Sequence, residues 1–166
     1  RYERYDKVGW GTPIRRNAYP PDAYWYSNMP RRVLELHGEE AARLIPKIEK
    51  AIEDYPYGEP GGYHIYPGPN SNTFVAHVLR SVPELGVVLP PDAVGRDYLP
   101  NGAFIHVADD WKDISLSLGG LLGVSAGVRS GFELNFLGLV AGFDVVNPGI
   151  KIPGLGYFGT GYQLGV

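Results

Sequence analysis

The chain contains no cysteine among its 166 residues. Disulfide bonds, thiolate zinc sites and a cysteine nucleophile are therefore excluded within this chain. A nucleophile in this chain would have to be another side chain, such as the hydroxyl group of a serine.

The chain has no excess of positive charge. Its 15 Lys and Arg residues are outnumbered by 18 Asp and Glu residues, which gives a formal net charge of −3. Because nucleic-acid binding needs a basic stripe or patch, this balance offers no electrostatic argument for it. We expect no nucleic-acid partner.

A long uncharged apolar run is also missing. The longest apolar stretch, Ile114 to Phe143, is interrupted by Arg129, Glu133, Asn135 and many glycines. A membrane helix needs roughly 20 mostly apolar residues in a row, so this stretch does not fit one. The chain starts at Arg1 rather than Met, and we expect it to be a processed product or a fragment.

The patterns of cofactor and metal sites are absent as well. The glycine-rich C-terminal part has no phosphate-loop motif with Lys and Ser or Thr. His106, Asp109 and Asp110 offer nitrogen and oxygen ligands, but their spacing matches no diagnostic metal motif. We therefore expect no cofactor and no metal.

The length and composition fit one soluble domain over residues 1–166. Apolar residues make up 44% of the chain and charged residues 20%, values that are ordinary for a fold with one core. Charge is concentrated in the N-terminal half, and residues 114–166 hold only Arg129, Glu133, Asp144 and Lys151. No linker-like stretch separates the two parts, so a single domain is predicted.

Two segments have helical spacing, and short strands are predicted over residues 1–10 and 31–38. The first helix has its apolar residues on one face: Ala41, Leu44, Ile45, Ile48, Ile52 and Tyr55. Pro46 lies inside this pattern, so either the helix begins near Ile45 or a longer helix is kinked. The second helix ends at Pro83, and its expected buried stripe is Phe74, Val75, Val78, Leu79 and Val82.

The C-terminal third alternates with period two. Apolar and polar residues alternate over residues 114–118, 132–136 and 150–152. Such alternation is typical of antiparallel strands with one buried, apolar face, and the glycines between the runs would supply turns. We predict a sheet meander that completes the core. The fold class is α+β, an antiparallel sheet with two main helices.

The segment Asn70-Ser71-Asn72-Thr73 precedes the second helix and supports two interpretations. Asn and Ser are preferred N-cap residues, because their side-chain oxygens accept the free N–H groups of the first turn, and capping alone explains the composition. Alternatively, Ser71 lies at the positive end of a helix, where hydrolases hold a nucleophile. Asn70, Asn72 and Thr73 would then be binding residues around Ser71.

A serine nucleophile needs a base within hydrogen-bond reach, and the histidines are the candidates. His77 is excluded, because six residues along a helix place it about 240° around the axis from Ser71. Three histidines remain, and spacing does not select among them: His37, His64 and His106.

Three stretches carry a family resemblance: "VGWGTPIRRNAYPPDAYWYSNMP", "LHGEEAARLIPKIEKAIEDYPY" and "PGPNSNTFVAHVLRSVPELGVVLPPDAVGRDYL". They resemble a bacterial family catalogued as domain of unknown function 3750, from about Tyr5 to Gly159. Members of that family look like envelope proteins with an N-terminal membrane segment. The resemblance implies the periplasmic side of the inner membrane, membrane association through residues not in this chain, and a membrane protein complex as partner.

The shorter stretch "NSNTFVAHV" resembles the helix start of circularly permuted papain-like hydrolases. In those enzymes a cysteine begins the helix and a histidine from an upstream strand is its base, so Ser71 takes the cysteine's position. The resemblance implies a permuted papain-like architecture. Because serine replaces cysteine and no matching histidine is identified, it favours a non-enzymatic domain. That domain is either a pseudoenzyme that retains a groove or an accessory subunit of a membrane assembly.

The alternative that this resemblance implies is an amide or ester hydrolase. Ser71 would be its nucleophile and an upstream histidine its base. His64 and His106 are the candidates for catalytic histidines within this chain.

Overall fold

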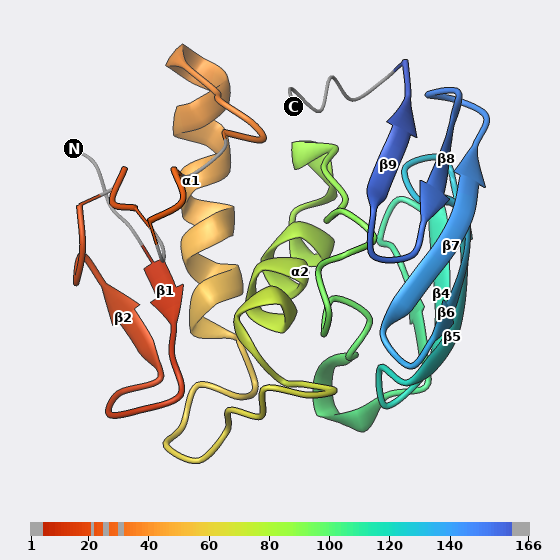
Figure 1. Ribbon diagram of the computed structural model, residues 1–166. Coiled ribbons are helices and arrows are strands. Elements are labelled where there is room, and N and C mark those ends of the chain that lie inside the picture. The colour runs from red at the N-terminus through yellow and green to blue at the C-terminus, as the bar shows by residue number, and fades with distance from the viewer. Residues whose placement is uncertain (1–4, 21, 25–26, 30–31, 161–166) are drawn as a thin grey trace.

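The computed structural model describes residues 5–20, 22–24, 27–29 and 32–160 (Figure 1). Two short strands come first, then two α-helices, and then a run of seven strands. The elements are β1 Tyr5–Lys7, β2 Ile14–Arg16, α1 Gly38–Glu53, α2 Ser71–Ser81, β3 Ile105–Val107, β4 Asp113–Leu118, β5 Leu122–Gly127, β6 Gly131–Phe136, β7 Leu139–Asp144, β8 Gly149–Ile152 and β9 Gly156–Gly159.

The elements form layers that follow one another across the view in Figure 1. The β1–β2 hairpin lies at one side, next to α1, and α2 lies between α1 and the strands β3–β9. These strands form one antiparallel sheet, which we call the large sheet. The predicted α+β class, an antiparallel sheet with two main helices, is confirmed. The permuted papain-like architecture and the single domain stay predictions.

Helix α1 contains Pro46 in its interior, eight residues after its first residue, Gly38. Of the two predicted alternatives, the structure therefore has the longer helix. Glu39 and Glu40 lie in the first turn and Lys50 in the last, the arrangement that the helix dipole favours. An interior proline costs about 3 kcal/mol, which the buried apolar face of α1 must offset. No helix in the described ranges is long and apolar enough to span a bilayer.

The prediction of a strand over residues 31–38 is wrong for the described part. Residues 32–37 are extended but belong to no ladder, and α1 begins at Gly38. Val33 and Leu34 are 48% and 41% exposed, so their apolar character does not mark a buried strand. The predicted strand over residues 1–10 is shorter in the structure, because β1 covers Tyr5–Lys7, and residues 1–4 lie outside the described ranges.

The core of the molecule lies between the two helices. Leu44, Ala51 and Val82 are buried together, and four half-buried side chains pack against them: Leu36, Ile48, Val78 and Leu85. The predicted apolar faces are therefore largely confirmed. Ile45 and Val75 are exceptions, because they are 51% and 41% exposed at the margins of their stripes.

A buried lysine joins the β1–β2 hairpin to the segment after α1. Lys7 Nζ donates to Tyr55 Oη at 3.0 Å and to the carbonyl oxygens of Tyr57 at 2.8 Å and Gly62 at 2.7 Å. Burial lowers the pKa of Lys7 to about 8. These three acceptors fix the hairpin against the helical layer.

The large sheet is a simple meander in which every strand pairs with its neighbours in sequence. Tight turns make this order possible. The β4–β5 turn contains Gly119 and Gly120, whose φ angles are +57° and +72°. Other residues adopt such left-handed backbone only with strain, so glycine suits both positions.

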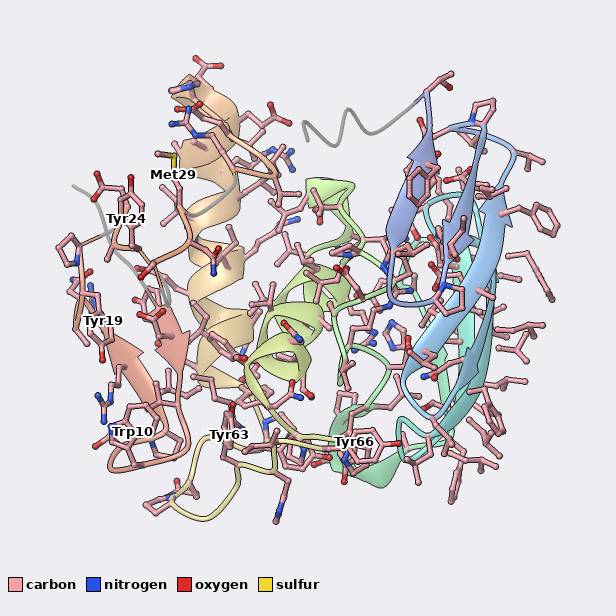
Figure 2. All side chains as sticks on the ribbon, in the orientation of Figure 1. Trp10, Tyr19, Tyr24, Met29, Tyr63 and Tyr66 are labelled. Carbon is pink, nitrogen blue, oxygen red and sulfur yellow. The ribbon has the colours of Figure 1, made fainter. Side chains whose placement is uncertain are left out.

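The large sheet buries the set of side chains that was predicted to be exposed, and exposes the set that was predicted to be buried. Glu133, Asn135 and Lys151 are buried, with exposures of 3%, 8% and 8%. Their apolar neighbours Leu134 and Ile150 are 49% and 52% exposed. Figure 2 shows side chains projecting from the large sheet on the side away from α2. The sheet therefore has a polar inner face toward α2 and an apolar outer face.

The reason for this inversion lies outside the strands. Period two fixes which residues share a face, but the layer packed against the sheet decides which face is covered. That layer carries Arg80 of α2 and Arg96 of the following loop, and Arg96 pairs with Glu133. A guanidinium group in that position requires a polar inner face.

Candidate functional site

The predicted capping segment begins α2 with a reciprocal pair of hydrogen bonds. Asn70 is the N-cap, and its Oδ1 accepts from the Thr73 backbone N–H at 3.1 Å. Thr73 Oγ1 in turn accepts from the Asn70 backbone N–H at 3.0 Å. This capping box accounts for the polar side chains of Asn70 and Thr73 without any ligand.

The same segment fastens α2 to the loop over residues 94–95. The side-chain amides of Asn70 and Asn72 donate to the Val94 carbonyl at 3.0 Å and 2.9 Å, and Thr73 Oγ1 donates to the Gly95 carbonyl at 2.7 Å. Gly95 has a φ of +97°, and a side chain there would overlap the Asn70 amide. The role of Asn70, Asn72 and Thr73 as binding residues stays a prediction.

Ser71 is the first residue of α2, and its side chain is exposed. Within the described ranges, no hydrogen bond joins Ser71 to a histidine. His64 is exposed in the loop before α2, and His37 is exposed and pairs with Glu35 at 3.3 Å. A nucleophilic Ser71 with His64 or His106 as base therefore stays a prediction.

His77 lies between the helices rather than on the surface. Its Nε2 is 2.9 Å from the Ala51 carbonyl, and its ring meets the Tyr55 ring edge-on with centroids 5.3 Å apart. Burial lowers the pKa of His77. The helix geometry predicted that His77 cannot face Ser71, and its side chain is instead used to pack α2 against α1.

A row of mostly polar residues crosses the inner face of the large sheet, one residue from each strand. The cross-strand pairs align His106, Ser115, Ser125, Glu133, Gly142, Lys151 and Tyr157. We call this the polar row. Of these residues, His106 was singled out from the sequence, whereas Ser115, Glu133 and Lys151 were assigned to the solvent side of their strands. The alternation itself contained the information that they share one face.

Glu133 is the charge centre of the polar row. Its Oε2 accepts from Arg96 Nη2 and its Oε1 from Lys151 Nζ, and all three side chains are buried. Burial by itself would lower the pKa of Arg96, but the carboxylates of Glu133 and Asp97 outweigh it and raise that pKa. Two buried cations thus depend on one carboxylate, and Asp97 assists Arg96 at 3.5 Å.

A second group of ion pairs joins the β3–β4 connection and the start of β4 to the β5–β6 turn. Arg129 Nη1 and Nη2 donate to the two oxygens of Asp110 at 2.6 Å and 2.9 Å, and Nη2 lies 2.8 Å from Asp113 Oδ2. The hydrogen bonds from Arg129 lower the pKa of Asp110. Arg129 therefore binds the Asp110 carboxylate, which the sequence offered as a metal ligand beside His106.

A cavity of about 80 Å³ lies between α2 and the polar row. Arg80 projects into its lining from α2, and His106, Ser115 and Ser125 line it from the sheet. Burial, followed by the charge of Arg80, lowers the pKa of His106. The lining combines charged and hydroxyl groups with apolar side chains such as Leu79 and Val88, and the cavity is large enough to hold water-sized groups.

The outer face of the large sheet consists of three apolar rows. Cross-strand pairs align Val107, Ile114, Ala126, Phe132, Phe143, Ile150 and Phe158 in the first row, Ile105, Leu116, Val124, Leu134 and Ala141 in the second, and Leu118, Leu122, Phe136 and Leu139 in the third. Every one of these side chains is exposed. The centroids of the Phe132 and Phe143 rings lie 5.6 Å apart. This face is a candidate docking surface.

The comparisons with known proteins bear on the N-terminal part of the chain. A family described as "Protein of unknown function (DUF3750)" matches residues 1–98. The match includes β1, β2, α1 and α2 and ends before the large sheet, whereas the resemblance predicted an extent to about Gly159. No curated protein and no solved structure matches the chain.

Proposed function

We propose that the chain, which belongs to the DUF3750 family of proteins of unknown function, is a non-enzymatic binding domain that docks through the outer face of its large sheet. We further propose that it is an accessory subunit of a membrane assembly on the periplasmic side of the bacterial inner membrane. The exposed apolar rows support the binding role. The family resemblance supports the location and the membrane assembly.

The extent of the outer face is the observation that carries this proposal. Seven strands about 4.8 Å apart make a face about 29 Å wide, and the six-residue strands β4–β7 make its central part about 20 Å long. Monomeric soluble proteins rarely expose apolar patches larger than about 300–600 Å². A stable interface buries about 800 Å² from each partner, which is the scale of this face once the side chains are included.

The charge pattern favours a protein surface over a lipid headgroup layer. Three of the four charged residues of the C-terminal third, Glu133, Asp144 and Lys151, are buried, and the fourth, Arg129, lines the inner cavity. The three apolar rows themselves contain no charged residue, and so no basic group that could attract anionic lipid, which is how amphipathic surfaces strengthen membrane binding.

The occupant that we propose for this face is a second copy of the chain. A second copy offers an uncharged apolar surface of the same extent, and a two-fold axis would cover both faces at once. Two such sheets would pack about 10 Å apart, with strand directions within about 30°, as in β-sandwiches. The dimer would be the form in which the subunit joins the assembly.

Sedimentation velocity over a range of concentrations tests this proposal. We expect the unaltered chain to dimerise and Leu134→Asp to weaken the dimer at least 100-fold, because the variant would bury unpaired charges at the interface. Ile45→Asp is the matched control, since Ile45 is 51% exposed on α1 and Leu134 is 49% exposed on the sheet. The control should dimerise like the unaltered chain.

Two outcomes would contradict the proposed occupant. If both the unaltered chain and Ile45→Asp sediment as monomers at all concentrations, the second copy is not the partner. If the unaltered chain floats with neutral phosphatidylcholine vesicles and Leu134→Asp does not, the outer face binds lipid instead. Circular dichroism of both variants separates either outcome from a failure to fold.

A hydrolase is the second candidate function, and the exposed Ser71 at the start of α2 is the observation that favours it. A serine-directed fluorophosphonate tests it on the full-length protein. Labelling that disappears in Ser71→Ala would support the hydrolase and replace the non-enzymatic proposal. Equal labelling of both proteins, or of neither, would rule it out.

A further inference from the structure

Arg80 in the cavity between α2 and the polar row forms no ion pair with another described residue, although the charges of Asp97 and Glu133 favour its protonated form. Its Nη2 donates to the carbonyl oxygen of Arg96, and its Nη1 is buried without a hydrogen-bond partner. None of the ion pairs between described residues includes Arg80. The guanidinium group of this cavity-lining residue therefore has one nitrogen without a hydrogen bond.

The neighbouring carboxylates are already engaged by other groups. Glu133 is shared between Arg96 and Lys151, as described above. Asp113 Oδ1 accepts from the Ser130 hydroxyl at 2.9 Å, and its Oδ2 lies 2.8 Å from Arg129 Nη2 but forms no hydrogen bond. Asp97 lies 3.5 Å from Arg96 Nε and accepts from the Asn135 amide at 2.8 Å. The lining thus contains equal numbers of arginines and carboxylates, but the pairing leaves Arg80 out.

The Arg80 guanidinium group keeps its positive charge at neutral pH. Burial lowers its pKa to about 10, which still leaves the guanidinium group protonated at pH 7. A buried charge is strongly unfavourable unless it is paired and hydrogen-bonded. The planar N–H edge of arginine matches the geometry of carboxylate and phosphate oxygens. An anion with oxygen acceptors would therefore satisfy the Arg80 guanidinium group.

The rest of the cavity suits such an anion. Ser125 Oγ donates to Ser115 Oγ at 2.9 Å, which leaves the Ser115 hydroxyl proton available as a donor. The volume of about 80 Å³ holds several water-sized groups. Pro83 and Arg129 line both this cavity and a groove on the surface, so the two hollows are neighbours.

We propose that this cavity binds a small oxyanion, with the chemistry of a phosphate or a carboxylate, against Arg80 and the Ser115 hydroxyl. The site lies on the inner face of the large sheet and is independent of docking through the outer face. A phosphate or carboxylate group could be free or could belong to a larger molecule that reaches the cavity from the groove.

His106 provides the readout for this site. The charged and titratable groups that act on it are Arg80, His77, Asp109 and Asp113. Arg80 disfavours a proton on His106, and an anion bound to Arg80 would offset that effect. Occupation of the cavity should therefore raise the pKa of His106 by roughly one pH unit.

An NMR titration of the imidazole signals in the whole chain tests the proposal. Sodium sulfate and sodium acetate are the probes, with sodium chloride at the same ionic strength as reference. We expect a saturable rise of the His106 pKa in sulfate or acetate but not in chloride, while exposed His37 does not respond. Arg80→Gln should abolish the response, and Arg43→Gln, an exposed arginine on α1, should keep it.

The outcomes separate an anion site from a water-filled cavity. The same His106 pKa in all three salts, or a full sulfate response in Arg80→Gln, would overturn the proposal. If Arg80→Gln does not fold, Ser115→Ala takes its place and should weaken the sulfate affinity about fivefold, the loss of one hydrogen bond. Unchanged affinity in Ser115→Ala would then overturn the proposed contact. A response to sulfate alone indicates a phosphate-like ligand, and a response to acetate alone indicates a carboxylate.

Discussion

The two faces of the large sheet are built from the same strands, but one buries charged side chains and the other exposes apolar ones. On the inner face, Glu133 and Lys151 are buried as ions and must satisfy each other. On the outer face, Leu134 and Ile150 are apolar and remain half-exposed. The inner face is thus costly to alter, and the ions of Glu133 and Lys151 are engaged by contacts within the chain. The outer face contributes little to folding and is available to a partner.

This difference shows that burial and hydrophobicity are separate properties of a strand. Exposed apolar surface is ordinary when side chains are scattered, but three aligned rows without a charge are not. A sheet that buries its ions and exposes its apolar side chains supports the proposed docking through its outer face. The predictions below compare the two faces, from the largest expected effect to the smallest.

Replacement of the central carboxylate should have the largest effect on stability. Glu133→Gln removes the negative charge shared by Arg96 and Lys151 and leaves two buried cations without their partner. Breaking a buried pair in this way costs about 3–5 kcal/mol. Urea unfolding followed by circular dichroism measures the loss. A change below about 1 kcal/mol would show that water reaches the inner face.

Loss of the helix cap should have an intermediate effect. Asn70→Ala removes the capping box and the amide contact to Val94, which should lower the free energy of unfolding by about 1–2 kcal/mol. Ser71→Ala, one residue away and exposed, is the control and should change it by less than about 0.5 kcal/mol. Thermal unfolding of both variants provides the comparison. Equal losses would contradict the capping assignment.

Acid should destabilise the inner side of the molecule through its buried histidines. Burial lowers the pKa of His77 and His106 below 6.5, so below that pH the unfolded chain binds more protons than the folded chain. The free energy of unfolding should therefore fall as the pH decreases from about 6.5. Urea unfolding from pH 7.5 to 5 checks this. His106→Gln should flatten the slope.

The smallest effect is expected on the outer face. Leu134→Gln, adjacent in sequence to Glu133, should change the free energy of unfolding of the dissociated chain by less than about 0.5 kcal/mol, because the residue is half-exposed. The same urea experiment at low protein concentration measures it. A loss of 2 kcal/mol or more would mean that the outer face is covered within the chain.

Much of the helical part could be predicted from the sequence. The spacing of Leu44 and Ile48 identified one buried face of α1, and the polar residues around Asn70 identified the start of α2. Both features are local, because helix faces and caps are determined by residues three or four positions apart. The continuation of α1 through Pro46 could not be chosen, since it depends on packing against α2.

The sheet was predictable in its strands but not in its orientation. The alternation around Glu133 identified which residues share a face of the sheet, but it did not identify which of the two faces is covered. The choice depends on Arg80 and Arg96, which lie far away in the sequence and contact the sheet only after folding. The cavity was missed for the same reason. Of its lining, His106 had been considered as a site residue, both as a catalytic base and as a metal ligand.

The in-register rows of the large sheet also restrict how the gene can change in length. Insertion of one residue within β6 would place Leu134 where Glu133 now meets Lys151, and would bring a carboxylate to the outer face. Insertion of two residues would preserve both faces. Length variation within these strands should therefore be restricted to even numbers, and odd changes should be confined to the turns.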